Sequence, residues 1–573
     1  MDADAERCVA PHLTSVLREL AEATAALKPM HPKIFEDVPF VPQLVSALAE
    51  GADQYGAMAA IELGYRLQAI LPLPQEDYRQ DFDAVGARKF DALRGQADRI
   101  LELPPQHSGR EESYTLAGRA IIAHCDILIA LWDGEPARGT GGTADVVSMA
   151  LRRGVPVIHL AMQTGVTSRI LWTGYEEFVD STDLESMPFR LVEPATLHAL
   201  AHAVIGPPTH PPTLDDLEHY LGERQRRARP RIEYPLLLAL FGIKPLRRSA
   251  FASERYEEAT CVEWLNFRNS CGPERFGVDV TLTDLERSFA WADQLAQHFG
   301  QIYRSGHALN FTLAASAVLI ALTGLFLPRF AFPLAIAEAS VIATFVANTL
   351  IGSRQQWHRR WLEYRQLAER VRPMRSLKLL GVASPPIAGR QGEGSTASWI
   401  EWYARAQWRA AGCPTGRLTD ATGLTQAIVR EELEPQIRYN HGSGHQMHVL
   451  DHRLHQVGIM LFCLTILSCI LSVVVNLISH ASHEVHLMFI VASAGLPTIG
   501  AAIFGIRMQG DFCSTAERSL ITADDLTRIA KALDNPANSL ARQTDLAEAA
   551  AATMLSDVAE WRRAYNLRTL QFV

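Results

Sequence analysis

CDILIALWDGEPARGTGGTADVVSMA, residues 125–150, is the stretch of sequence that decides the fold of this chain. An apolar run over residues 127–132, typical of a buried strand, ends at Asp133 and passes through a glycine-rich loop into a helical pattern that begins at Thr143. Glycines leave backbone N–H groups uncovered, and the start of a helix adds its positive dipole end, so this arrangement binds anions. The stretch therefore predicts a phosphate-binding loop at the carboxyl end of a strand.

Strand and helix patterns alternate on both sides of this stretch. We predict strands at residues 44–48, 69–73, 126–132 and 155–160. Helices are predicted at residues 57–67, 82–101, 113–124 and 143–153, after a helical segment over residues 1–35. Strands separated by helices of this length form parallel β-α-β units. The predicted fold class is therefore α/β, a Rossmann-like domain with a doubly wound parallel sheet.

Three polar or glycine-rich loops lie at residues 51–54, 72–78 and 133–143, where predicted strands end. Ligands of doubly wound sheets bind outside the carboxyl ends of the strands, so we expect the three loops to form one ligand site. Any one of these loops alone is equally compatible with an ordinary turn, because glycine adopts positive φ at little cost. The candidate ligand-binding residues are Gly51, Asp53, Asp133, Gly139, Thr140, Gly141, Gly142 and Thr143.

Four apolar segments of 20 to 22 residues lie far downstream, at residues 308–327, 332–351, 457–478 and 487–506. A helix needs about 20 such residues to cross the hydrocarbon core of a bilayer. We therefore predict an all-α membrane domain with four transmembrane helices in two hairpins, and a lipid bilayer as partner. Glu338 is the one acidic residue in these segments, and we treat it as a pore candidate. A protonated carboxyl group that bonds a neighbouring helix explains Glu338 equally well.

The distribution of charge predicts the orientation. Lys and Arg are abundant outside the two hairpins, whereas the first tip, at residues 328–331, holds only Arg329 and the second, at residues 479–486, holds neither. By the positive-inside rule, both termini and the α/β head face the cytoplasm. The N-terminus has no positive region ahead of an apolar core, so no signal peptide is predicted. A formal net charge of −9 gives no reason to expect a nucleic-acid partner.

These patterns divide the chain into five predicted regions. They are the nucleotide-binding α/β domain at 1–206, a linker and helical adaptor at 207–300, the first two-span module at 301–380, a cytosolic helical connector at 381–450, and the second two-span module with C-terminal helices at 451–573. Ala-Glu-Arg follows both hairpins, at 368–370 and 516–518, but at unequal distances from the spans. Duplication of the module therefore remains open at this point.

The head resembles the SLOG superfamily of Rossmannoid nucleotide-binding domains, which includes Lonely-guy phosphoribohydrolases and the sensor region of melastatin-type TRP channels. The resemblance rests on SALAEGAD at 46–53, on ILPLP at 70–74 with YRQDF at 78–82, and on DILIALWDGEPARGTGGTADVV at 126–147. The hairpins are similar in architecture to SLATT-type two-span effector modules. The resemblance implies a bacterial inner-membrane protein of a nucleotide-signalling, anti-phage system, with an ADP-ribose-like, NAD-derived or cyclic nucleotide as ligand and no certain cofactor.

Two departures from that family bear on activity. No Gly-His-Arg-like turn precedes Ser46, so one wall of the family's phosphate site is missing or replaced. Hydrolytic members place a glutamate three residues after the Thr of the glycine-rich loop, whereas Val146 stands there in this chain. Asp145 lies one position away, where we expect it to point elsewhere on the helix. Without a carboxylate to assist cleavage, binding is favoured over catalysis.

Three functions are compatible with the sequence. The first is a ligand-gated channel or membrane-disrupting effector whose head senses a nucleotide and which we expect to be a homo-oligomer. The alternative is a membrane-anchored nucleotide or NAD glycohydrolase, for which Asp145 or Asp133 would be the catalytic carboxylate. The third is a constitutive channel whose head serves assembly alone. We favour the first, with no catalytic residue and no metal assigned.

Overall fold

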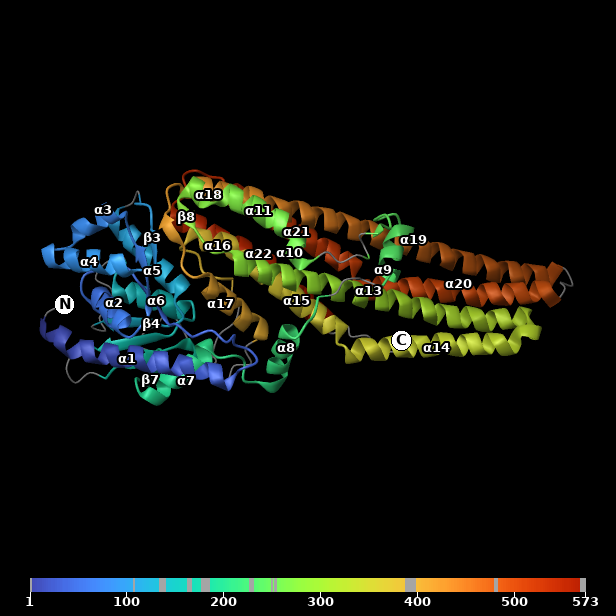
Figure 1. Cartoon of the computed structure of the whole chain (residues 1–573). Helices are drawn as coiled ribbons and strands as arrows, with labels where there is room; N and C mark the ends of the chain where they lie inside the picture. The colour runs from blue at the N-terminus through green and yellow to red at the C-terminus, as the bar shows by residue number, and fades with distance from the viewer. Residues whose placement is uncertain are drawn as a thin grey trace.

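A computed structural model describes residues 3–106, 109–132, 141–161, 167–176, 186–225, 231–248, 251, 255–386, 398–478 and 483–566 of the 573-residue chain. The molecule is elongated. An α/β domain lies at one end, and long helices run away from it side by side (Figure 1). This arrangement confirms the predicted fold class of an α/β domain with a mostly parallel sheet followed by a helical region.

The strands in the described part of the chain fall into two sheets. Their bounds are β1 Gln43–Ser46, β2 Arg66–Leu71, β3 Arg99–Glu102, β4 Leu128–Trp132, β5 Val157–Ala161, β6 Arg169–Leu171, β7 Phe189–Leu191, β8 Val278–Asp279 and β9 Thr415–Arg417. The first sheet has the order β1-β2-β3-β9-β8 and the second β4-β5-β6-β7. The pairs β1–β2, β2–β3, β3–β9 and β4–β5 are parallel, and the others are antiparallel.

Two details of the predicted sheet were wrong. The single sheet is divided, because β1 and β4 do not pair in the described structure. The helix predicted at 82–101 ends early: α4, Ala84–Gln96, is capped by the Asp83 carboxylate and is followed by β3. Leu101 and Leu103, at alternate positions, are both buried, which is the period of a strand and not of a helix.

The first sheet is completed by strands from distant parts of the chain. β9 pairs with β3, with Leu101 opposite Gly416, and the Arg417 guanidinium pairs with the Glu102 carboxylate at 2.7 Å. β8 then adds to β9. Gly277 and Gly416 both have positive φ, and a Cβ on Gly416 would lie 2.1 Å from the Gly277 carbonyl oxygen. The two glycines therefore permit an approach of the backbones that other residues would block.

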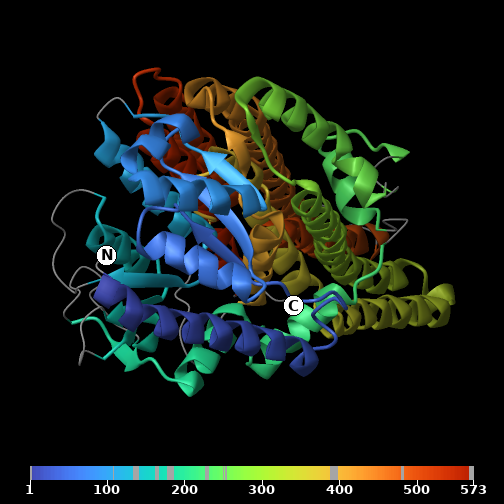
Figure 2. The ribbon, with the colours of Figure 1, turned by 60° about the vertical axis from the view of Figure 1, so that its left-hand side comes forward.

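The helices of the α/β domain cover these sheets. Their bounds are α1 Ala3–Met30, α2 Ala52–Glu62, α3 Gln75–Tyr78, α4 Ala84–Gln96, α5 Arg110–His124, α6 Thr143–Arg152 and α7 Pro194–Ile205. The next helix, α8 Pro211–Leu221, packs against the helical body instead. α1 and α7 run along the outside of the domain next to each other (Figure 2). Leu17 of α1 and Leu200 of α7 belong to one buried cluster with Ile158 of β5.

The remaining helices form the helical body. Their bounds are α9 Glu233–Leu240, α10 Tyr256–Ala259, α11 Cys261–Cys271, α12 Pro273–Phe276, α13 Thr283–Phe326, α14 Ala331–Arg354, α15 Trp357–Val371, α16 Met374–Leu380, α17 Trp399–Ala411, α18 Ala421–Ile428, α19 Glu434–Ile478, α20 His483–Gly510, α21 Phe512–Leu533 and α22 Leu540–Asn566. A π-helical stretch, Val429–Leu433, joins α18 to α19.

The four predicted spans lie on four long apolar helices, α13, α14, α19 and α20, that pack in pairs as hairpins. α13 and α19 have 44 and 45 residues, so each continues without a break from the helical body into its apolar segment. Side by side, the helices follow the order α14, α13, α20, α19 (Figure 1). Few residues of the apolar segments are fully buried in the single chain.

The two hairpins share a plan that their Ala-Glu-Arg motifs did not reveal. In each, the return helix ends at a residue in the left-handed conformation, Gln356 (φ 50°) after α14 and Asp511 (φ 47°) after α20. A buried aromatic residue follows at once, Trp357 or Phe512, and a helix then packs back against the long helix. The Ala-Glu-Arg motifs lie at different distances from these turns and are not equivalent.

Candidate functional site

The loop after β1 has a fixed and unusual backbone. Leu48 is fully buried with φ 58°, and Gly51, which precedes α2, has φ 100°. The Gln54 side-chain amide holds the loop by donating to the carbonyl oxygens of Leu48 (3.3 Å) and Gly86 (3.2 Å). A non-glycine residue in this conformation is uncommon and is maintained only by its surroundings. The loop is therefore preorganised and not a generic turn.

Asp53, in the first turn of α2, ties this loop to the end of β1. Its carboxylate accepts a hydrogen bond from the Ser46 hydroxyl (3.2 Å) and another from the backbone N–H of Ala47 (3.1 Å). Burial raises the pKa of Asp53, and the hydrogen bonds from the loop oppose that shift. Asp53 is half-buried as a residue and is among those that line the adjoining cavity.

Tyr78, the last residue of α3, brings a second polar group to the same place. Its ring packs against Phe82 and Phe90, with centroid distances of 4.8 and 5.7 Å, and its side chain is only 1% exposed. The hydroxyl group has no hydrogen-bond partner among the residues that the structure describes. Burial, and next the nearby Asp53 carboxylate, raise the pKa of Tyr78, so the group is neutral. A buried hydroxyl without a partner costs about 1–3 kcal/mol.

The start of α6 forms the facing wall. Gly141 has φ 84°, and its N–H donates to the Asp145 carboxylate at 3.0 Å. A Cβ on Gly141 would lie 2.9 Å from Thr115 Oγ1 of α5, so only glycine fits. Gly142 is the N-cap of α6 and Thr143 its first residue. The Asp145 side chain therefore holds the loop at its own helix N-terminus.

A cavity of about 280 Å³ lies between these walls, at the carboxyl ends of β1 and β4. Of the predicted site residues, Asp53, Gly141 and Thr143 line it, and Gly51 and Gly142 are chain neighbours that shape the two loops. Asp133, Gly139 and Thr140 lie outside the described residues. Glu338 is half-buried on α14, far along the chain from this cavity.

Tyr78 and Tyr114 also line the cavity. Tyr78 belongs to a predicted site loop, but Tyr114, on α5, was missed. Its hydroxyl donates to the Asp81 carboxylate, which also pairs with Arg110, and burial raises the pKa of Tyr114 to about 12. One sequence signal for Tyr114 was the glycine at position 118, one turn further along α5, because a glycine inside a helix indicates that another element packs closely there. In the structure that element is α6, since a Cβ on Gly118 would lie 2.7 Å from Val146.

The chemistry of the described lining favours a compact, largely apolar ligand with hydrogen-bonding edges. Asp53 is the only charged side chain among the described lining residues, and most of the others are aliphatic or aromatic. A carboxylate accepts ribose hydroxyls or base N–H groups, a tyrosine hydroxyl donates or accepts, and a helix N-terminus favours an anion.

The unpaired edges of β1 and β4 continue as a seam beyond this cavity. A second cavity, of about 490 Å³, lies at the amino ends of the same strands and shares Leu44, Val45 and Ile129 with the first. Trp402, Trp408 and Arg409 of α17 line it from the helical body, together with Lys378 of α16. The seam thus leads from the candidate site to the junction of the two parts of the molecule.

That junction is polar and closely packed. The Trp408 indole N–H donates to the Ala123 carbonyl oxygen at 2.9 Å, and Arg409 pairs with Asp126 at 2.9 Å. One turn earlier on α5, Arg119 pairs with Asp545 (2.6 Å) and Glu548 (3.1 Å) of α22. The end of α5 and the residue pair before β4 are therefore bound to α17 and α22 of the helical body.

Comparison with known proteins adds no assignment to this geometry. The chain matches no protein-family model, no curated protein and no solved structure.

Proposed function

We propose that this chain is a nucleotide-sensing membrane effector, in which the α/β domain binds a nucleotide and the four apolar helices respond in the bilayer. The observation that carries the proposal is the cavity between β1 and β4, with the Asp53 carboxylate and the unpartnered Tyr78 hydroxyl beside the start of α6. A ligand that forms a hydrogen bond with Tyr78 removes the free-energy cost of burying that hydroxyl group without a partner. This gain favours the ligand-bound state of the site.

The seam supplies a route for the response. A ligand held between β1 and β4 changes the spacing of two strands that do not pair with each other in the described structure. The amino ends of these strands contact α17, and α17 packs against α13 and α15. Coupling requires different ligand affinities in two arrangements of these elements. Because no backbone hydrogen bonds among the described residues join β1 and β4 across the seam, a change in the spacing of these two strands costs less free energy than a change elsewhere in the sheets.

The packing of the spans favours more than one copy of the chain. In one chain the spans lie as a row, with α14 at one edge and α19 at the other, and few span residues are fully buried (Figure 1). A row encloses no channel, so a channel requires the rows of several chains. We propose a homo-oligomer and keep Glu338 on the edge helix α14 as the pore candidate.

The resemblance to SLOG and SLATT modules supports placing this effector in the bacterial inner membrane, with the head and both termini in the cytoplasm. In that setting the ligand is an ADP-ribose-like, NAD-derived or cyclic nucleotide, and the response arrests an infected cell. We rank a glycohydrolase below this function, because Asp145 accepts the Gly141 N–H and Asp53 holds its own loop, while the other candidate carboxylate, Asp133, lies outside the described residues. Neither carboxylate has a second one beside it in the described lining.

The test is thermal unfolding of the detergent-purified full chain with a panel of adenine nucleotides, ADP-ribose isomers and cyclic dinucleotides. A ligand at about 100 times its Kd stabilises its site by about 2.7 kcal/mol. We expect one ligand class to shift the transition and to be recovered intact. Gly142→Trp, which places an indole at the start of α6, should abolish the shift.

Tyr78→Phe is the sharper variant. It removes the unpartnered hydroxyl and keeps the ring that packs on Phe82 and Phe90, so the protein without ligand should be as stable as wild type or about 1 kcal/mol more stable. The ligand-induced shift should fall. No shift with any nucleotide, or an undiminished shift in both variants, would remove the proposed site. Recovery of free base or ribose phosphate would favour the glycohydrolase instead.

A further inference from the structure

A second cavity with a different chemistry lies where the two hairpin modules meet, on the α/β-domain side of the spans. Its volume is about 690 Å³. Residues of α13 and α15 line it from the first module, residues of α19 and α21 from the second, and residues of α9 and the following loop close one side. This cavity is separate from the candidate nucleotide site, and its argument does not rest on the proposed function.

The charge of this cavity is unbalanced. Its cationic lining residues are Lys244, Arg247, Arg304, Arg365 and Arg518, and its one carboxylate is Glu369. Two of the five cations have acidic partners, since Arg365 pairs with Asp293 (3.1 Å) and Glu369 (2.5 Å), and Arg518 lies 3.7 Å from Asp511. No carboxylate in the described parts of the chain pairs with the other three.

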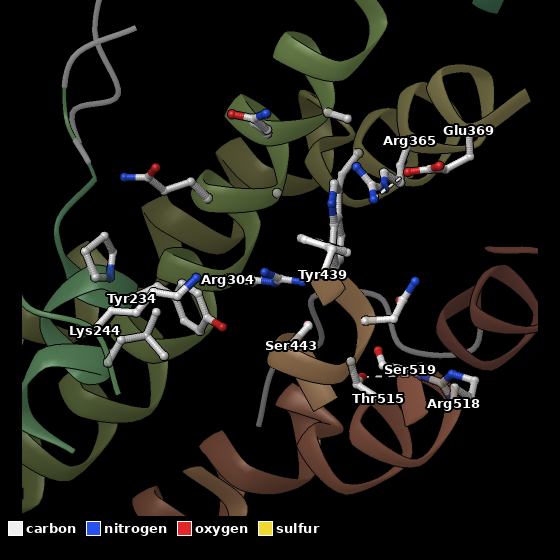
Figure 3. Close-up of a pocket in the computed structure, with 18 of the residues that line it drawn as sticks. Tyr234, Lys244, Arg304, Arg365, Glu369, Tyr439, Ser443, Thr515, Arg518 and Ser519 are labelled. Atoms are coloured by element: carbon white, nitrogen blue, oxygen red, sulfur yellow. Dashed lines mark hydrogen bonds and ion pairs between the residues drawn. The ribbon is translucent and has the colours of Figure 1, made fainter. Parts of the chain in front are cut away.

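Of the three cations without an acidic partner in the described parts of the chain, Arg304 gives the strongest indication of an anion in the cavity. It lies on α13, half-buried, with its guanidinium over the rings of Tyr234 (5.3 Å to the centroid) and Trp361 (4.8 Å). Figure 3 places it between the side of the cavity that holds Tyr234 and Lys244 and the side that holds Thr515, Arg518 and Ser519. Aromatic faces offset only part of the cost of withdrawing a guanidinium from water. A counter-anion in the cavity would supply the rest.

Neutral donors complete the lining. The hydroxyl groups of Ser519 and Thr522 project from α21, and both residues are 7% exposed. Ser443 on α19 and Thr515 on α21 add two more hydroxyls, and Arg518 donates to Thr515 at 3.3 Å. Guanidinium groups with hydroxyl donors around a cavity are the groups that recognise a phosphate.

We propose that this cavity binds a phosphate-bearing anion that bridges the two hairpin modules, with Arg304 and Arg365 of the first module on one side and Arg518 and Ser519 of the second on the other. The anion would stabilise the arrangement in which the modules stand together. Its source is either a lipid headgroup or a soluble phosphate compound. Arg304 lies four residues before residue 308, where the apolar segment starts, a distance of about 6 Å along the helix, so a headgroup reaches it.

The experiment measures binding to the full-length chain in a neutral detergent. One arm titrates inorganic pyrophosphate and follows thermal unfolding. The other adds phosphatidylglycerol or phosphatidylcholine and counts bound lipids by native mass spectrometry. We expect saturable binding in at least one arm and, in the lipid arm, a preference for phosphatidylglycerol. Pyrophosphate binding indicates a soluble ligand, and binding confined to phosphatidylglycerol indicates a headgroup.

Arg304→Gln should weaken that binding about tenfold or more, the effect of losing one charge-assisted hydrogen bond. Arg528→Gln is the matched control, because Arg528 is an exposed arginine on the same helix as Arg518 and does not line the cavity. Lys244→Gln, at the exposed rim, tests the site without altering the buried packing and should weaken binding less. The proposal fails if neither probe binds saturably, or if Arg304→Gln and Lys244→Gln both bind as wild type does.

Discussion

Lys378 is a buried cation at the junction of the α/β domain and the helical body. Its ammonium group donates to the Gly412 carbonyl oxygen (2.7 Å), lies 3.1 Å from His124 Nδ1 and stands 3.9 Å from the centroid of Trp408. Burial lowers the pKa of Lys378 from 10.5 to about 7. Burial, and next the Lys378 charge, also lower the pKa of His124, whereas burial raises that of the neighbouring Cys413 to about 12. Lys378 is thus the member of this group that titrates near neutral pH.

The stability of the wild-type protein relative to Lys378→Met should rise with pH between about 7 and 10.5. In this window the unfolded lysine binds a proton that the folded lysine has released, so each step to higher pH favours the folded state. Below about pH 7 both states are protonated, and the full penalty of burying the charge is present. Chemical unfolding of both proteins at several pH values measures the difference.

At the same scale, the sequence identified residues with backbone roles better than residues with side-chain roles. Asp53, Gly141 and Thr143 line one cavity, because loops at the carboxyl ends of parallel strands meet by topology alone. Tyr114 lies in an ordinary helical pattern, and its place at the cavity depends on how α5 packs. Arg304 is one of many arginines in the sequence, and its lack of an acidic partner is a property of tertiary structure that composition does not reveal.

Each hairpin has a polar clasp near the end of its spans closest to the α/β domain. In the first, the Asn348 amide donates to Asn310 Oδ1 (2.7 Å) and to the Gly306 carbonyl oxygen (3.2 Å). In the second, Arg507 of α20 forms a bidentate pair with Asp451 of α19, at 2.8 and 2.9 Å. Both clasps join a long helix to its return helix. A partly buried bidentate pair contributes more to stability than an exposed one.

Asp451→Asn should therefore destabilise the second hairpin by about 1–3 kcal/mol, because it leaves the Arg507 guanidinium half-buried without a counter-charge. Unfolding in mixtures of mild detergent and sodium dodecyl sulfate measures the loss. A double-mutant cycle with Arg507→Gln isolates the coupling of the pair. Glu434→Gln breaks the exposed pair with Arg438 on the same helix and should change stability by less than about 0.5 kcal/mol. Equal effects of the two substitutions would contradict a structural role for the clasp.

Elements with a strong local period were predictable, and elements defined by distant partners were not. The four spans are long and apolar throughout, so length and hydropathy were sufficient to locate them. β9 has only three residues, Thr415–Arg417, and two of its positions pair with a strand more than 300 residues earlier in the sequence. β3 follows α4 after two residues, so its short apolar run was absorbed into the preceding helical pattern. The shared left-handed turns after α14 and α20 have no common residue type, Gln356 in one and Asp511 in the other.

At the scale of the whole molecule, the α/β domain and the helical body share one buried core. Leu101 and Leu116 of the domain belong to the same cluster as Leu367 of α15, Leu424 of α18 and Leu526 of α21. β8 and β9 extend that continuity through the sheet. A domain with its own closed core moves as a separate body on a linker. A shared core instead transmits a change in the domain to the helices, and it makes their unfolding one event.

The soluble part of the chain should therefore unfold in a single calorimetric transition, and Gly416→Ala should divide it into two. A Cβ at Gly416 would lie 2.1 Å from the Gly277 carbonyl oxygen, and φ of 109° is strained for alanine, so β8 and β9 must separate. The α/β domain then loses an edge strand of its sheet, whereas the long helices keep their packing contacts. Gly95→Ala makes the same change in α4 with no atom within 4 Å of the added Cβ, and should raise stability by up to about 1 kcal/mol with one transition kept. Two transitions in the wild-type protein would show that the α/β domain unfolds independently of the helical body. That result would contradict the proposal that the shared core transmits a change in the domain to the helices.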